Sequence, residues 1–173
     1  MAEHVRFLTP DTLAPPPGYS YVVESTAPAR IFYFAGQLGL DLDNRLVGPD
    51  FHSQATRAFE NLKAALAAVG ATFDDVVKIN NYLTDMGDIA SFREVRDRFF
   101  RRDPKPASTT VGVTALARPG AVFEIEAVAV LPATAAPARR SATVRKAAAR
   151  SKAKAKGKPK RKAPAKARKR RSR

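Results

Sequence analysis

Apolar residues recur at a helical spacing in two stretches of the chain. In residues 51–69 they are three and four residues apart, as on one face of an α-helix: Ala55, Phe59, Leu62, Leu66 and Val69. Residues 89–101 repeat the spacing with Ile89, Phe92, Val95 and Phe99. Asp50 and Asp88 are placed to cap the two N-termini, and Gly70 is placed to end the first stretch. We therefore predict two amphipathic helices.

Strand-like segments surround these helices. They cover residues 5–8, 19–24, 30–37, 75–83, 109–116 and 121–131. The Ser-Thr-Ala-Pro sequence at 25–28 predicts a hairpin-like connection, and Ala-Arg-Pro-Gly at 117–120 predicts a turn between the last two strands. Three strands, a helix, a strand, a helix and two strands then follow one another. This order predicts an α+β domain whose two helices cover one face of a sheet.

The last predicted strand carries apolar residues on both of its faces. Phe123, Ile125, Ala127, Ala129 and Leu131 alternate with Val122, Glu124, Glu126, Val128 and Val130. In residues 75–83, Val77, Ile79 and Leu83 are expected to oppose Val76 and Tyr82. Because two helices cover only one face, we expect the other face to be a contact between copies of the chain.

Charge divides the chain into two parts. Residues 1–134 contain 13 Lys and Arg and all 16 Asp and Glu, a net charge of −3, whereas residues 135–173 contain 18 Lys and Arg and no acid, a net charge of +18. The second part consists mainly of Lys, Arg, Ala and Pro, and Val144 is its only large apolar residue. Such a segment buries too little apolar surface to offset chain entropy. We therefore predict a folded domain over 1–134 and a disordered basic tail over 135–173.

The tail predicts non-specific binding to nucleic acid or another polyanion. It has no aromatic residue to stack on bases, which leaves phosphate neutralisation with counterion release as the mechanism. Its dense cationic runs contain Lys152, Lys154, Lys156, Lys158, Lys160, Arg161, Lys162, Arg168, Lys169, Arg170 and Arg171. A solubilising appendage and a localisation signal are the alternatives that this composition leaves open.

Several features are absent from the sequence. The chain has no cysteine, which excludes disulfides, thiol nucleophiles and zinc–thiolate sites. Its two histidines lie far apart, and no motif has metal-ligand or phosphate-loop spacing, so we expect no metal and no other cofactor. A signal sequence and a membrane-length apolar segment of roughly 20 residues are also missing. We expect a cytoplasmic protein with no membrane partner, associated with nucleic acid through its tail.

Short motifs distributed over residues 19–131 are shared with a known family. They are FAGQ (34–37), NLKAAL (61–66), VVKIN (76–80), YLTD (82–85), PA (106–107) and FEIEAVAV (123–130). With these motifs the sequence resembles the Rid family, also called YjgF-like and labelled endoribonuclease L-PSP. The resemblance implies a chorismate-mutase-like α+β protomer and a homotrimer whose sheets pack inward, with small-molecule clefts between subunits. In active members these clefts hydrolyse 2-imino or 2-enamino acids to 2-oxo acids and ammonia, as in 2-iminobutanoate/2-iminopropanoate deaminases.

The resemblance also implies which residues line the cleft. Glu124 corresponds to the family glutamate that handles water, and Tyr19, Gly36 and Thr110 correspond to substrate-binding positions. Ser108 stands where active deaminases have the arginine that binds the substrate carboxylate. A serine hydroxyl has neither the charge nor the planar pair of donors of a guanidinium, so we expect an altered specificity.

The sequence leaves more than one function open. The first is an imine or enamine hydrolase in which Glu124 positions water. The second is a non-catalytic trimeric module that binds a ligand or associates with nucleic acid. In that case Glu124 is an interface carboxylate, Ser108 and Thr110 are strand-edge hydroxyls, Tyr19 is a packing aromatic, and Gly36 permits close strand approach. Ribonuclease activity is disfavoured, because no histidine pair or metal constellation is present to cleave a phosphodiester.

Overall fold

The computed structural model describes residues 4–8, 10, 12–13, 16 and 18–133. The chain divides into two units, Met1–Arg139 and Arg140–Arg173, and all described elements belong to the first. They are β1 (Val5–Leu8), β2 (Val22–Ser25), β3 (Ala29–Leu38), α1 (Phe51–Ala67), the short 3₁₀ turn η1 (Phe73–Asp75), β4 (Val76–Leu83), a second 3₁₀ turn η2 (Met86–Asp88), α2 (Ile89–Phe99), β5 (Ala107–Gly112) and β6 (Phe123–Pro132). The predicted basic tail and its lysines and arginines lie outside the described residues.

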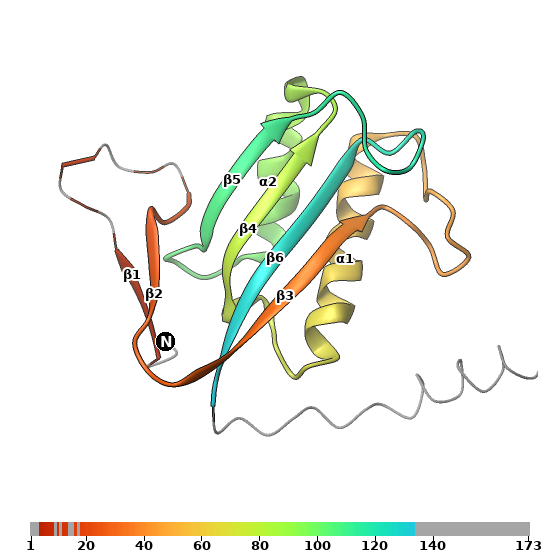
Figure 1. Ribbon diagram of the computed structural model, residues 1–173. Helices are drawn as coiled ribbons and strands as arrows, with labels where there is room; N and C mark the ends of the chain where they lie inside the picture. The colour runs from red at the N-terminus through yellow and green to blue at the C-terminus, as the bar shows by residue number, and fades with distance from the viewer. Residues whose placement is uncertain (1–3, 9, 11, 14–15, 17, 134–173) are drawn as a thin grey trace, which may run out of the picture. The chain divides into compact units, whose positions relative to one another are not determined.

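Four strands form a mixed sheet in the order β3-β6-β4-β5 (Figure 1). β6 pairs antiparallel with both β3 and β4, and β5 pairs parallel with β4. The predicted turn at 117–120 is confirmed, with the backbone N–H of Ala121 donating to the carbonyl of Arg118 at 3.0 Å and Gly120 at φ of 80°. The two strands that it connects do not pair with each other, because β4 lies between β5 and β6. β5 also ends at Gly112 and not at residue 116, since its ladder with β4 ends where β4 ends, at Leu83.

The two N-terminal strands form a separate two-stranded sheet. β1 and β2 pair antiparallel, and the backbone N–H of Thr26 donates to the carbonyl of His4 at the end of this pair. A hairpin between the strand ending near residue 24 and the next one was expected. That expectation is wrong, because β2 pairs with β1, whereas β3 pairs with β6.

The two helices cover one face of the four-stranded sheet, as predicted (Figure 1). Asp50 caps α1 by accepting the backbone N–H of Ser53 at 2.8 Å, and Gly70 follows the helix with φ of 80°. Asp88 makes no side-chain cap bond to α2, because η2 runs directly into that helix. The predicted apolar stripe of α1 is confirmed: Ala55, Phe59, Leu62 and Leu66 are fully buried.

Alternation along β6 separates the two faces of the sheet. Phe123, Ile125, Ala127, Ala129 and Leu131 lie in the core, as predicted. In β4 the expected alternation is wrong at its start, because the register shifts between Val76 and Lys78 and places Val76 in the core together with Ile79 and Leu83. The face turned away from the helices, called the outer face below, carries exposed apolar side chains at Ile31, Tyr33 and Val111.

Neither helix in the described part of the chain combines the length and the apolar character needed to cross a membrane.

Candidate functional site

Glu124 and Gly36 lie against each other on the outer face. The ladder between β3 and β6 is interrupted between Phe34 and Gln37, and Gly36 lies in this bulge. A Cβ atom at position 36 would stand 1.7 Å from Oε1 of Glu124. Only glycine therefore lets the backbone of β3 approach the carboxylate this closely. The two residues that the sequence assigned to catalysis and to substrate binding are brought together within a single chain.

The surroundings of Glu124 favour its protonated form. Its side chain alternates with the buried Phe123 and Ile125, and Glu126 follows on the same face. Burial raises the pKa of Glu124, and the negative charge of Glu126 raises it further. A carboxyl group with a raised pKa is able to take and return a proton nearer to neutral pH.

Glu126 is held by two neighbours on β4. Its Oε1 accepts the amide of Asn80 at 2.7 Å and the hydroxyl of Tyr82 at 3.0 Å. The bond from Tyr82 to this carboxylate raises the pKa of the tyrosine, and burial adds to the effect. The carboxylate of Glu126 is therefore held in place beside Glu124. Alternation along residues 121–131 places Glu126 on the same face as Glu124, but its partners on β4 follow only from the register of the two strands.

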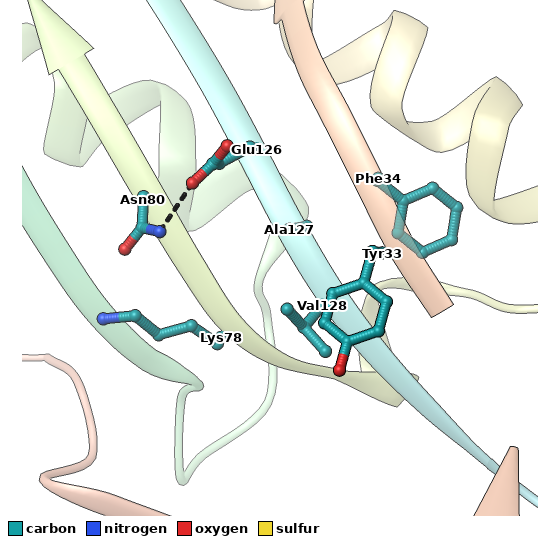
Figure 2. Close-up of a pocket in the computed structure, with 7 residues that line it drawn as sticks. All are labelled: Tyr33, Phe34, Lys78, Asn80, Glu126, Ala127 and Val128. Carbon is teal, nitrogen blue, oxygen red and sulfur yellow. Dashed lines mark hydrogen bonds between the residues drawn. The ribbon is translucent and has the colours of Figure 1, made fainter. Parts of the chain in front are cut away.

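A cavity of about 120 Å³ opens on the same face beside Glu126. Figure 2 shows that Tyr33 from β3, Val128 from β6 and Lys78 from β4 surround it, with the bond from Asn80 to Glu126 at one side. The ammonium of Lys78 donates to the hydroxyl of Thr109 at 2.5 Å, and burial lowers the pKa of this lysine. The cavity thus has one apolar side and one charged side.

A second cavity, of about 330 Å³, is lined by Gly36 and its neighbours at the end of β3 and by residues of α1. The polar side chains of Asp41 and Asn61, which line it, already make hydrogen bonds within the protein. Asp41 accepts the backbone N–H groups of Asp43 and Arg45 at 2.9 Å, and Asn61 donates to the carbonyls of Leu38 and Leu40 at 3.0 Å. This space offers room beside Gly36 but no uncommitted acid or base among these lining groups.

Ser108 and Thr110 lie on the opposite face of the sheet from Glu124. They pair with Ile79 and Asn81, and the amide of the buried Asn81 lies 3.2 Å from each hydroxyl oxygen. The fold of a single chain therefore does not bring these two predicted binding residues to Glu124. Asn81 was missed from the sequence, although its position between Ile79 and Leu83 places it on the buried face of the strand.

Tyr19 lies at the start of β5, away from Glu124. The next residue, Ser20, donates its backbone N–H to the carbonyl of Pro106 at 3.2 Å and its hydroxyl to that of Lys105 at 2.6 Å. The ring of Tyr19 packs edge-on against Tyr21, with centroids 5.5 Å apart. In β4 and β5 the residues beside Pro106 lie at the Lys78 end, whereas Glu124 pairs with Tyr82.

The arrangement on the outer face suits proton transfer to and from a small molecule. Within the described ranges, no three His, Asp or Glu side chains are grouped to hold a metal ion. Histidine contributes nothing beside Glu124: His4 is buried with Nε2 3.1 Å from the carbonyl of Val130, and His52 is exposed on α1.

Comparisons with known proteins point to one family, and the matched residues include nearly all of the described chain. The family model described as endoribonuclease L-PSP matches residues 10–131. "Protein DfrA" of Myxococcus xanthus is 44% identical over 113 residues, which cover 65% of this chain and 84% of that protein. The "2-iminobutanoate/2-iminopropanoate deaminase" of Dermatophagoides farinae is 36% identical over 125 residues, 72% of this chain and 91% of that protein. The solved structure of YyfB from Yersinia pestis, a protein of unknown function described as belonging to the conserved Rid family, superposes with a TM-score of 0.68 at 33% identity. It covers 74% of this chain and 99% of that one.

Proposed function

The chain belongs to the Rid family, also known as the YjgF or endoribonuclease L-PSP family, and on that premise we propose that it hydrolyses an imine or enamine to a carbonyl compound and ammonia. The observation that carries the proposal is the contact between the Glu124 carboxylate and the backbone at Gly36. It places an acid with a raised pKa beside unhindered backbone groups on a partly buried surface.

The chemistry needs one group that moves a proton twice. Glu124 takes a proton from water while the water oxygen adds to the C=N carbon. Glu124 returns this proton to nitrogen, which gives the neutral carbinolamine. It then takes the proton of the carbinolamine hydroxyl and passes it to nitrogen as C=O forms and the C–N bond breaks to release ammonia. The net reaction is imine plus water to carbonyl plus ammonia, and one carboxyl group serves as base and then as acid.

The first test is an assay of the full chain on imines generated in situ. We expect faster release of pyruvate from 2-iminopropanoate, or of pyruvamide from the uncharged 2-iminopropanamide, than in buffer alone. The second substrate is included because Ser108 offers no positive charge to a carboxylate. No acceleration with either imine would exclude the hydrolase and favour the non-catalytic ligand-binding module.

We propose in addition that the active unit is a homotrimer with the site between subunits. Two observations support it: the exposed apolar side chains on the outer face, with Tyr33 80% and Ile31 54% exposed, and the separation of Glu124 from Ser108 and Thr110 within one protomer. A second copy is needed for all of these residues to meet at one ligand. Light scattering after size exclusion should give three times the chain mass, and a monomer would contradict this proposal.

Glu126 should set the pH range in which Glu124 works. Because the charge of Glu126 raises the pKa of Glu124, the Glu126→Gln variant should have a lower Glu124 pKa. The base must be ionised, so the acid limb of the kcat/KM profile should move to lower pH in this variant. The matched control is Glu60→Gln, an exposed residue of α1, which should leave the limb in place. An unmoved limb in Glu126→Gln would show that the two carboxylates are not coupled.

The second function that we propose is attachment to nucleic acid through the basic tail. It is supported by the net charge of +18 in residues 135–173 against −3 in the rest of the chain. Gel shifts of the full chain should weaken steeply and equally for unrelated DNA sequences between 50 and 200 mM salt, by about 10³-fold or more if six or more phosphates are neutralised. Replacing the tail lysines and arginines by glutamine should abolish the shift. Binding that survives this change, or that ignores salt, would exclude the tail as the contact.

A further inference from the structure

Asn81 is a buried polar residue in an otherwise apolar row. It lies in β4 between Ile79 and Leu83, and all three are almost fully buried on the helix-covered face. Its Nδ2 atom is 3.2 Å from Ser108 Oγ, 3.2 Å from Thr110 Oγ1 and 3.1 Å from the carbonyl oxygen of Thr109. The amide therefore bridges β4 to three consecutive residues of β5, which is the edge strand of the sheet.

The Thr109 carbonyl determines which way the amide faces. A carbonyl oxygen only accepts hydrogen bonds, so the Asn81 atom beside it must be the nitrogen. The Oδ1 atom then points away from β5 and is buried, and no donor among the described residues reaches it. An amide oxygen in this state costs stability and offsets part of what the contacts of Nδ2 contribute. What Asn81 contributes is the alignment of the two hydroxyl groups.

The two hydroxyls are left with their hydrogens available. Where the Asn81 nitrogen donates to a hydroxyl oxygen, the single O–H hydrogen of that residue is directed elsewhere. Ser108 and Thr110 are only partly buried, lie on the same face of an edge strand, and have no charged partner among the described residues. Together they present two neutral O–H donors at the border of the sheet.

We propose that Asn81, Ser108 and Thr110 form a neutral donor pair that binds the carbonyl of an uncharged amide or ester in preference to a free carboxylate. A carboxylate that leaves water without a cation to receive it loses more hydration energy than two neutral donors return, whereas an amide oxygen does not. The net charge of −3 over residues 1–134 also repels an anionic ligand and so disfavours a carboxylate. This inference rests on the proposed hydrolase and on the proposed trimer, because it names the class of substrate for a site in which a second copy brings Glu124 to this donor pair.

The test compares pyruvate with pyruvamide, which differ only in carboxylate and carboxamide. Each is titrated into the full chain at 150 mM salt, so that anions held by the tail are screened, and the amide resonances of β5 are followed by NMR. We expect pyruvamide to bind about tenfold more tightly than pyruvate, the equivalent of one to two net hydrogen bonds. Equal affinities, tighter binding of pyruvate, or binding of neither probe would overturn the inference.

Variants test whether Asn81 aligns the two hydroxyl groups or only packs in the core. Asn81→Leu and Ser108→Ala should each lose the preference for pyruvamide, and Ser108→Arg should reverse it. The matched control is Thr109→Val, which removes a hydroxyl on the same strand that faces the other way, toward Lys78, and should keep the preference. The unfolding temperature of Asn81→Leu is measured on the same sample. A lower unfolding temperature with an unchanged preference would make Asn81 purely structural and overturn the inference.

The outcome is distinguishable from that of the proposed function. Hydrolysis that depends on Glu124 but shows no amide preference would leave the hydrolase standing and remove the donor pair. Conversely, preferential binding of pyruvamide without hydrolysis of either imine would keep the donor pair and remove the hydrolase.

Discussion

Glu124→Gln should lower kcat for imine hydrolysis by about 10²- to 10⁴-fold, the usual contribution of a single acid–base group. Glutamine keeps the size and the hydrogen-bonding capacity of the side chain but cannot take a proton from water. The fold should not suffer, because the change removes a carboxyl group whose raised pKa reflects an unfavourable charge in this position. The measurement is the initial rate of carbonyl release at saturating imine, together with the unfolding temperature of the same sample.

A matched control distinguishes this effect from a general loss of surface charge. Glu24→Gln changes an exposed carboxylate of β2 that pairs with Arg6, and it should leave the rate unchanged. If Glu124→Gln retained the parental rate, Glu124 would be excluded as the group that moves the proton.

Two neighbouring glycines should respond to alanine in opposite ways. At Gly36 the added Cβ meets the end of a flexible side chain, Oε1 of Glu124 at 1.7 Å, so the carboxylate can swing aside. At Gly39 it meets the backbone of α1, with Cα of Gln54 at 2.6 Å and its carbonyl oxygen at 2.7 Å. Gly36→Ala should therefore lose activity and keep its stability, whereas Gly39→Ala should lose about 3 kcal/mol of stability.

Gln54 explains why the helix cannot retreat from position 39. Its side-chain amide nitrogen donates to the carbonyls of Gly48 and Gly120 at 2.9 and 3.0 Å, and its Oε1 accepts the N–H of Val122 at 2.9 Å. Moving α1 away from an added Cβ at position 39 would strain all three hydrogen bonds of Gln54. Urea unfolding gives the two free energies, and the imine assay gives the two rates. Equal losses of stability in both variants would contradict the assignment of Gly36 to the site.

Elements with a strong local pattern could be predicted from the sequence. The stripe of α1 and the alternation of β6 each repeat over a full element, so burial on one side is visible in the residue order. The pairing of the strands could not be predicted in this way. Parallel pairing of β5 with β4 depends on a crossover through α2, and local turn signals such as residues 117–120 carry no information about it.

In the candidate site, too, some features follow from local sequence and others depend on how the strands pair. The contact of Glu124 with Gly36 lies between strands whose motifs are recognisable, and the structure brings the two together. The face on which Ser108 and Thr110 lie depends on the register of β5 against β4, which no single segment specifies. Asn81 is the exception, because alternation from Ile79 to Leu83 already places an amide inside the core.

The position of β6 has a consequence for biosynthesis. This strand is the last of the described elements, yet it lies between β3 and β4 and pairs with both (Figure 1). While the nascent chain ends before Phe123, β3 has no partner and β4 has only β5, so their apolar faces and open edges remain available to other chains. The sheet is therefore completed only after β6 has been synthesised, and chains that terminate before β6 are expected to be substrates for chaperones and proteases.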